Sequence, residues 1–441
     1  MGVNIFRTFS ASFYFMIYPG LTPRANIFRP FRPPAIKSCA FLSILLISCS
    51  FLIGQENQVA IVPQNALKDV VHEMIDSAEK EILIAHFILL NDNSGLGVIN
   101  HLILKARAGV KVRVIIDGVG AYSNQRLTKK NLQEIAQAGI EIKVYHPKWR
   151  CFYKIRKRMH DKILIVDEKA LIGSSSFWDV SFDRWQVETD ILLQGKVLAT
   201  IKEHFEELWK SKEVYAVKKK EIKIPKYLGI KTSFQKVLND LNFTKVESLD
   251  YWSDGIKKEK GKGSFQKTLD LINQAQKVVI VVNPYFLPVK SLDKVLKKAH
   301  DKGVKIEVYT NSAEVLALEY KMLGVAYSRY DKLFKKWGIT VYEAPEKFGM
   351  IHSKIILVDG KKLYIGGQNL DPLGAKHNTE NGVCFESKEM TDWFRNELKF
   401  YQENFISAFQ DGAMKRKPYT IKNKWKWHWR KTLAICLKSV L

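Results

Sequence analysis

Cysteine is scarce in this sequence, and its few cysteines form no recognisable pattern. The 441 residues include five, at Cys39, Cys49, Cys151, Cys384 and Cys436. They show neither a CxxC pair nor a Cys/His cluster with the spacing of metal ligands. A chain of this length can bury a core without crosslinks, so a disulfide scaffold is not expected.

Acidic residues are missing from whole stretches of the chain. Lys and Arg number 70 against 45 Asp and Glu, which leaves a net charge of +25. Residues 1–54 and 148–158 are basic without a single acid, and none follows Asp411. Such a surface attracts polyanions, either anionic lipid headgroups or nucleic acid, unless the whole proteome is basic.

The basic C-terminal tail also carries three tryptophans, Trp425, Trp427 and Trp429. Basic residues interleaved with tryptophan are typical of an anionic membrane interface, where indole rings lie among the headgroups. The same composition also suits binding of single-stranded nucleic acid, or a solvated, disordered tail.

The sequence has no long apolar run near its N-terminus, only short ones. Residues 39–53 form a 15-residue apolar stretch that follows Arg29, Arg32 and Lys37, a pattern typical of a secretory signal. Within it, Leu46-Ile47-Ser48-Cys49 resembles the lipobox of bacterial lipoproteins, which implies lipidation of Cys49. An uncleaved signal anchor is the alternative, and a buried helix of a soluble domain is a third reading that the strongly basic flanks fit poorly. Either of the first two would hold the protein at a bacterial membrane, with its catalytic part outside the cytoplasm.

One unit of sequence occurs twice. MHDKILIVD at residues 159–167 and IHSKIILVD at residues 351–359 both fit H-x-K-x4-D. In each copy an Asp follows the His by 19 residues and a Glu follows it by 28, so the copies are 192 residues apart. This internal repeat predicts two similar lobes.

The segments before each motif alternate between helical and strand patterns. Helices are expected near residues 67–80, 97–108, 265–276 and 292–302, each followed by an apolar strand. This alternation predicts α/β lobes with mainly parallel sheets. The expected parts are a signal or anchor segment (1–54), lobe 1 (55–210), a linker (211–263), lobe 2 (264–410) and a tail (411–441).

The motif histidines and lysines are candidate catalytic groups. His and Lys at positions i and i+2 of a strand lie on one face, and the residues after them are too apolar for a solvated surface. A neutral imidazole can attack phosphorus, a protonated one can donate to the leaving group, and two ammonium groups can stabilise the transition state. Such a site needs no metal or cofactor.

The motif acids are expected to support this chemistry. Glu188 and Glu380 can each accept a hydrogen bond from a histidine ring and orient it. Asp167 and Asp359 end a strand and open a turn, which favours a structural role within the motif. The candidate catalytic residues are therefore His160, Lys162, Asp167, His352, Lys354 and Asp359, and the supporting residues are Glu188, Glu380, Ser174, Ser176, Asn369 and Asp371.

The paired motifs resemble those of the phospholipase D superfamily, over about residues 65–405. More narrowly, the sequence resembles the bacterial cardiolipin synthases of the C type, through RMHDK (158–162), NPYFLP (283–288), YTNSAEV (309–315) and GGQNLDPLGAKHNTENGV (366–383). The resemblance implies two pseudo-symmetric α/β lobes packed on each other, with the active site at their interface. It also implies a phosphohistidine on one motif histidine, His160 by analogy, with His352 as acid and base; exchanged roles are the alternative.

The two halves depart from the family pattern in different ways. Asn369 matches the polar residue of G-S-x-N, whereas Ser176 takes that place in the first half. The Arg that usually follows Asp-Pro is Leu373 here, which leaves the lipid headgroup undetermined.

The leading hypothesis is phosphatidyl transfer between membrane phospholipids, or to a small alcohol. Hydrolysis to phosphatidic acid would use the same groups, because water and an alcohol compete for one phosphohistidine. A metal-independent nuclease and a non-catalytic lipid-binding protein are the remaining alternatives. The membrane-directed N-terminus argues against the nuclease, and complete motifs in both halves argue against the binding protein. The expected partners are phospholipids and an anionic membrane surface, rather than nucleic acid or an obligate protein partner.

Overall fold

The computed structural model describes residues 56–118, 127–147, 157–183, 185–255, 262–319 and 321–419, all within one compact unit, Leu52–Leu441. The predicted signal segment with Cys49, the basic stretch 148–156 and the tryptophans of the tail lie outside the described residues.

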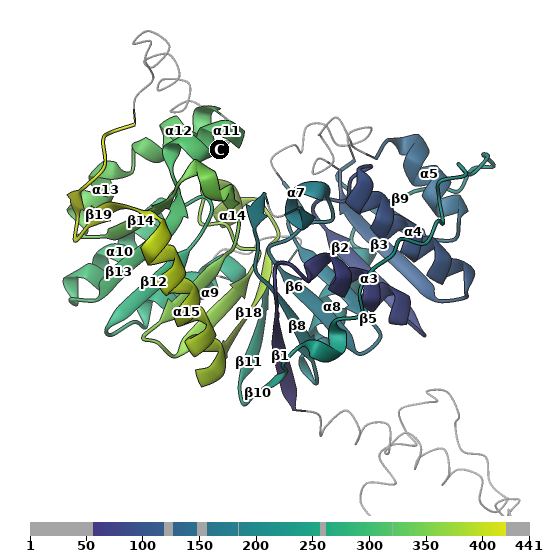
Figure 1. Cartoon of the computed structure of the whole chain (residues 1–441), viewed down its shortest axis with the longest axis horizontal. Helices are drawn as coiled ribbons and strands as arrows, with labels where there is room; N and C mark the ends of the chain where they lie inside the picture. The colour runs from purple at the N-terminus through teal and green to yellow at the C-terminus, as the bar shows by residue number, and fades with distance from the viewer. Residues whose placement is uncertain are drawn as a thin grey trace, which may run out of the picture. The chain divides into compact units, whose positions relative to one another are not determined.

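The first lobe contains a nine-stranded sheet with helices on both faces (Figure 1). Its elements are β1 (Asn57–Val62), α3 (Leu67–Ser77), β2 (Glu81–His86), α4 (Asn93–Arg107), β3 (Lys111–Asp117), α5 (Lys129–Gln137), β4 (Glu141–Tyr145), β5 (Lys162–Val166), β6 (Lys169–Gly173), α7 (Asp179–Phe182), β7 (Gln186–Val187), β8 (Asp190–Gln194), α8 (Val197–Lys210), β9 (Val214–Ala216), the 3-10 turn η2 (Leu238–Asp240) and β10 (Thr244–Val246).

The second lobe repeats this plan with a second nine-stranded sheet. Its elements are β11 (Leu249–Ser253), α9 (Ser264–Asn273), β12 (Val278–Val282), α10 (Lys290–Asp301), β13 (Lys305–Asn311), α11 (Ala313–Glu319), α12 (Lys321–Ser328), α13 (Asp331–Lys336), β14 (Thr340–Ala344), η3 (Glu346–Phe348), β15 (Met350–Ile351), β16 (Ile355–Val358), β17 (Lys362–Gly366), α14 (Pro372–Lys376), β18 (Asn381–Glu386), α15 (Lys388–Asn404), β19 (Ile406–Gln410) and β20 (Ala413–Met414).

The predicted α/β class and the helices expected before each motif are confirmed, but the expectation of mainly parallel sheets is wrong. Among the described strands of each large sheet, only three adjacent strands pair in parallel: β2, β3 and β4 in one, and β12, β13 and β14 in the other. Parallel neighbours need a crossover long enough for a helix, and α4 and α5 supply these crossovers in the first lobe, as α10 to α13 do in the second. The motif strand β5 turns directly into β6 at Asp167, so that pair is antiparallel.

The two lobes share a hydrophobic core. Strands β6 and β8 contact β17, and β6 also contacts β18, where the sheets meet (Figure 1). One cluster of fully buried side chains includes Ile163, Ile172 and Ile191 from the first sheet and Ile355 and Ile365 from the second. The sheets are therefore packed on each other as predicted, and each motif strand forms part of the common core.

The segment predicted to be a linker, residues 211–263, also contributes strands to both lobes. Strand β9 pairs with β4, and β10 pairs with β1, so both belong to the first sheet. Strand β11 pairs with β18 in the second sheet. No helix in the described part of the chain is both long and apolar enough to cross a membrane.

Candidate active site

The two motifs meet where short segments of one lobe pair with short segments of the other. Met159, just before the first motif histidine, pairs with Thr379 of the second lobe. In the second motif β15, which ends at Ile351, pairs with β7 of the first lobe. Thr379 is followed by Glu380, and β7 is followed by Glu188. The segment that carries each histidine therefore lies beside the segment that carries the glutamate of the other lobe.

Each histidine ring binds the glutamate of the opposite lobe. His160 Nδ1 donates to Glu380 Oε2 at 2.8 Å. His352 Nδ1 lies 2.9 Å from Glu188 Oε2 and 3.1 Å from Oε1. A carboxylate that accepts from Nδ1 keeps the proton there and leaves the Nε2 lone pair available for chemistry.

The motif lysines lie beside the histidines, as the i, i+2 spacing predicts. Lys162 Nζ is 3.1 Å from His160 Nε2 and also donates to the His160 carbonyl at 3.1 Å. Lys354 Nζ donates to the His352 carbonyl at 2.6 Å. Both lysine side chains are among the largest fully buried side chains of the described chain.

Burial shifts the protonation of all these groups. Burial and the charges of Lys162 and Lys354 lower the pKa of His160 well below its usual range. Burial lowers the pKa of His352 to about 4, although the charge of Glu188 opposes this shift. Since each motif's charges act on the other's histidine, the two motifs form one site.

The lysines and a glutamate are perturbed as well. Burial, assisted by the charge of Lys162, lowers the pKa of Lys354 to about 7, and burial lowers the pKa of Lys162 too. Burial alone would raise the pKa of Glu188, but the nearby His352 and Lys354 outweigh burial and lower this pKa to about 2. Shifts of this size in a cluster of buried groups are typical of catalytic sites.

Both glutamates are held by further hydrogen bonds. Ser181 Oγ donates to Glu188 Oε1 at 2.8 Å, and the Glu188 backbone N–H donates to the side chain of Gln64. Ser174, a predicted supporting residue, holds the residue after Glu188, because its Oγ donates to the Thr189 carbonyl at 3.3 Å and accepts from the Thr189 N–H at 2.8 Å. On the other side, the Glu380 backbone N–H donates to Asp254 Oδ2 at 3.1 Å. These contacts restrict the carboxylates to the orientation that the histidines need.

The motif aspartates, counted among the candidate catalytic residues, lie outside this cluster. Asp167 accepts hydrogen bonds from the backbone N–H groups of residues 79–81 at 2.7–2.9 Å. Asp359 accepts those of residues 276–278 at 2.8–3.0 Å. Each has positive φ, 47° and 53°, at the turn that ends the motif strand. Each aspartate therefore ties the end of its motif strand to the connection between α3 and β2 or between α9 and β12, which is a structural role.

The remaining predicted supporting residues are Asp371, Ser176 and Asn369, and each has a different environment. Asp371 caps α14 by accepting from Gly374 N at 2.6 Å, so it shapes the loop after the second motif. Ser176 is buried, and its backbone N–H donates to Ser181 Oγ at 3.2 Å. Asn369 is buried as well, and its Oδ1 has no hydrogen-bond partner within the described chain.

Several residues near the site were not predicted. Asp117 and Asn311 end the equivalent strands β3 and β13, and each accepts at 2.8 Å from the backbone N–H just before a motif histidine, that of Met159 or Ile351. Their common signal is a polar residue at the end of an apolar strand. Asp190 is also buried here, and burial together with the charge of Glu188 raises its pKa to about 7.

Two more observations complete the site. The Phe87 ring lies 4.7 Å from the His160 ring and forms an apolar side of the site. No group of three or more His, Cys, Asp or Glu side chains that could hold a metal ion occurs among the residues that the structure describes.

Comparisons with known proteins bear on this arrangement. The model of the family described as "Cardiolipin synthase, PLD-like domain" matches residues 71–209 and 268–401, one match for each lobe. Cardiolipin synthase B of Salmonella typhimurium is 25% identical over 338 residues, which cover 75% of this chain and 76% of that protein. Cardiolipin synthase C of Escherichia coli is 22% identical over 401 residues, with 77% and 83% covered.

A solved structure shares the whole fold. The crystal structure of phosphatidylserine synthase from Haemophilus influenzae Rd KW20 superposes with a TM-score of 0.69 at 15% identity, and it covers 90% of this chain and 99% of that one. This similarity concerns the fold alone, whereas the family model matches each lobe over the segment that contains its motif. The chain therefore belongs to the phospholipase-D-like family that this cardiolipin synthase model describes.

Proposed function

We propose that this protein transfers phosphatidyl groups between membrane phospholipids, or from a phospholipid to a small alcohol. The observation that carries the proposal is the pair of histidines whose Nδ1 atoms bind glutamates from opposite lobes while two buried lysines lie beside them. This arrangement offers one nucleophile, one proton carrier and two positive charges, which is what phosphodiester exchange requires.

His160 is the better candidate for the nucleophile. After burial, the strongest effects on its pKa come from Lys162 and Lys354, which keep the ring neutral. For His352, the strongest effect after burial comes from Glu188, which favours the protonated ring. His160 Nε2 would attack phosphorus and form a P–N bond as the P–O bond to the leaving alcohol breaks. A bound phosphodiester anion would, like Glu188, favour protonation of His352, and the protonated ring would give its proton to the departing alkoxide.

In the second half of the reaction, neutral His352 would take the proton of the acceptor hydroxyl. The acceptor oxygen would then attack phosphorus, and the P–N bond to His160 would break. Lys162 and Lys354 would stabilise the negative charge on the non-bridging oxygens in both steps. We propose that these two ammonium groups supply the positive charge that other phosphotransfer enzymes obtain from a metal ion, so the reaction is metal-independent.

The substrate assignment rests on the relatives. The family model and the curated relatives carry the name cardiolipin synthase, which supports phospholipids as substrates. Water in place of the alcohol would give phosphatidic acid by the same route, so hydrolysis is the nearest alternative. The net charge of +25 keeps a nuclease as the second candidate, because a basic surface also binds DNA.

Product analysis distinguishes these functions. The full chain would be incubated in EDTA with vesicles of labelled phosphatidylglycerol and phosphatidylethanolamine, and the lipids separated. Cardiolipin as the product supports transfer, whereas phosphatidic acid alone supports hydrolysis. Cleavage of DNA without any change in the lipids, suppressed steeply by salt, would replace the lipid function by a nuclease.

The phosphohistidine can be tested with a substrate whose leaving group needs no proton. With a p-nitrophenyl phosphodiester, His352→Ala should release a burst of nitrophenol and accumulate a phosphorylated His160 that acid cleaves and base does not. His160→Ala should give neither. A burst in His160→Ala but not in His352→Ala would instead identify His352 as the nucleophile and His160 as the proton carrier.

We further propose that the N-terminal segment attaches the protein to the membrane that holds its substrates, with the catalytic part outside the cytoplasm. The apolar run at residues 39–53 and its basic flank support this placement. Labelling cells with radioactive palmitate would decide between lipidation at Cys49 and a signal anchor. Label lost in Cys49→Ser indicates lipidation, and an unlabelled protein in the membrane fraction indicates an anchor.

A further inference from the structure

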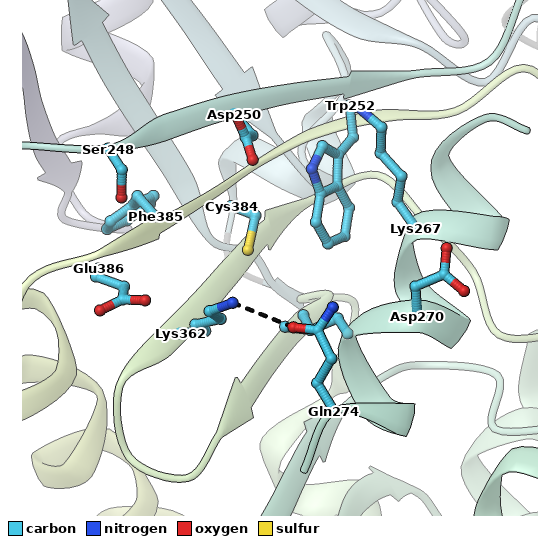
Figure 2. A pocket seen from close by; sticks show the side chains of 11 residues that line it. Ser248, Asp250, Trp252, Lys267, Asp270, Gln274, Lys362, Cys384, Phe385 and Glu386 are labelled. Carbon is cyan, nitrogen blue, oxygen red and sulfur yellow. Dashed lines mark hydrogen bonds between the residues drawn. The ribbon is translucent and has the colours of Figure 1, made fainter.

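A pocket of about 300 Å³ lies on the second lobe between helix α9 and strands β11, β17 and β18 (Figure 2). Cys384 and Trp252 point into it from neighbouring strands, and Lys362 donates to Gln274 Oε1 at 3.1 Å across it. None of its lining residues belongs to the histidine–lysine site. They are Ser248, Asp250, Trp252, Lys267, Asp270, Leu271, Gln274, Lys362, Cys384, Phe385 and Glu386.

The two lobes can be aligned at this place. Asp167 binds the backbone of residues 79–81 and Asp359 binds that of residues 276–278. These connections correspond at a spacing of 197 residues, as do the starts of α3 and α9. Asp270 of the pocket is therefore the counterpart of Glu73 on helix α3.

In the first lobe this helix face is covered by the chain that follows β9. Glu73 Oε2 accepts hydrogen bonds from the backbone N–H groups of Val237 and Leu238 at 2.6 and 2.8 Å. Leu238 is buried in the first-lobe core, and Leu241 and Phe243 pack against that core. The segment after the last edge strand thus returns across α3 and fills the place that is a pocket in the second lobe.

The sequence after β20 resembles this covering segment. Lys415-Arg416-Lys417 corresponds to Lys218-Lys219-Lys220, and Ile421 to Ile224, at the same spacing of 197 residues. Farther on, WRKTL at residues 429–433 shares an aromatic residue, a lysine and a leucine with FQKVL at residues 234–238, at a spacing of 195. The tail therefore repeats both the basic start and the apolar core of the segment that covers α3.

Charge also favours this occupant. The pocket is lined by three carboxylates, Asp250, Asp270 and Glu386, and by two lysines, Lys267 and Lys362. Residues 420–441 contain six Lys or Arg and no acid. Carboxylates near the surface attract such a segment, and the buried face of Trp252 offers apolar contact to its tryptophans.

We propose that the C-terminal segment, residues 420–441, docks along α9 and fills this pocket, with residues 429–433 in the place that residues 234–238 take on α3. The docked segment covers Cys384 and completes the second lobe as the linker completes the first. Its basic residues and tryptophans then contact the protein, so the pocket competes with an anionic membrane for the same segment. This proposal is independent of the proposed function.

The thiol of Cys384 reports on the pocket directly. In a full chain with Cys39, Cys49, Cys151 and Cys436 replaced by Ser, the rate of modification of Cys384 by methyl methanethiosulfonate would be measured in neutral detergent. A chain that ends at Tyr419 should react about tenfold faster, because a tethered segment occupies its site at high effective concentration.

Full-length variants exclude unfolding as the cause. Trp429→Ala combined with Leu433→Ala should accelerate labelling like the truncation, with an unchanged thermal midpoint. Lys130→Ala, on the exposed surface of α5, should leave the rate as it was. Equal rates in all these proteins would overturn the proposal. Protection that disappears on dilution would overturn it too, because the covering segment would then come from a second copy of the chain.

Discussion

His160 Nδ1 lies 2.8 Å from Glu380 Oε2, so the histidine of the first motif is oriented by a carboxylate that follows it by 220 residues. The same exchange occurs between His352 and Glu188. Neither lobe can therefore build a complete histidine–glutamate pair from its own motif, and the site exists only when the lobes are packed together.

Removing the charge of either glutamate should reduce turnover strongly. In Glu380→Gln the amide no longer holds the proton on His160 Nδ1, and we expect kcat to fall roughly a hundredfold or more, as for the aspartate of a catalytic triad. Glu389→Gln, on the exposed start of α15, is the matched control. The imidazole nitrogen shifts of His160 in NMR should change in Glu380→Gln only. Normal turnover with changed shifts would contradict a role of this pair in catalysis.

Activity should decline as pH rises through the pKa of Lys354. Burial lowers that pKa to about 7, so the free enzyme loses this positive charge above neutral pH. We expect kcat/KM to fall between about pH 6 and pH 9, since kcat/KM follows the ionisation of the free enzyme. Lys354→Arg, which stays charged, should move this decline to higher pH. A flat profile in the unmodified protein would show that the charge of Lys354 is not required.

Asp167 should matter for stability and not for chemistry. Asp167→Ala removes the acceptor of three backbone N–H groups and places Ala at a φ of 47°. We expect a loss of about 2–3 kcal/mol in the free energy of unfolding, with kcat of the folded protein unchanged. The neighbouring, exposed Glu168→Ala is the control. Urea titration measures the loss, and a fall in kcat at full stability would point to a catalytic role.

The same aspartate should contribute to acid sensitivity. Burial opposes its charge, but the three N–H groups outweigh this and hold the pKa of Asp167 below its usual 3.8. A lowered pKa in the folded state stabilises the protein above the unfolded-state pKa, and this contribution is lost as pH falls through the folded-state value. Asp167→Ala should therefore lose less stability on acidification than the unmodified protein. Parallel stability curves would refute this linkage.

Gly367 should not accept a side chain without a loss of activity. A Cβ atom there would lie 3.3 Å from Glu380 Oε2 and 3.6 Å from the His160 carbonyl oxygen. The carboxylate would have to move by a few tenths of an ångström, so we expect Gly367→Ala to lower kcat about tenfold, because catalysis depends on such positioning. Gly303→Ala is the control for a loss of stability. Its Cβ would lie in open space, but its φ of 77° strains the alanine, so this variant should be less stable with kcat unchanged. Unchanged kcat in Gly367→Ala would show that Glu380 tolerates the shift.

The sequence by itself determined the duplication and identified the candidate groups of the site. Identical spacings of His, Lys, Asp and Glu in two copies predicted the candidate groups and two lobes, and the alternation of helix and strand patterns before each motif predicted their α/β class. These features are local, because i, i+2 geometry and helix or strand periodicity act over a few residues. The sequence also indicated the turn role of Asp167 and Asp359, through their place at a strand end.

Only the tertiary structure decided which groups meet. Sequence spacing predicted that a glutamate could bind a histidine, but the crossing of Glu380 to His160 and Glu188 to His352 depends on contacts between residues more than 160 positions apart. The mixed pairing of the sheets and the backbone support from Asp117 and Asn311 depend on the same long-range packing. The pKa shifts do too, because desolvation of Lys354 and the histidines arises only when the two sheets bury them in one interface.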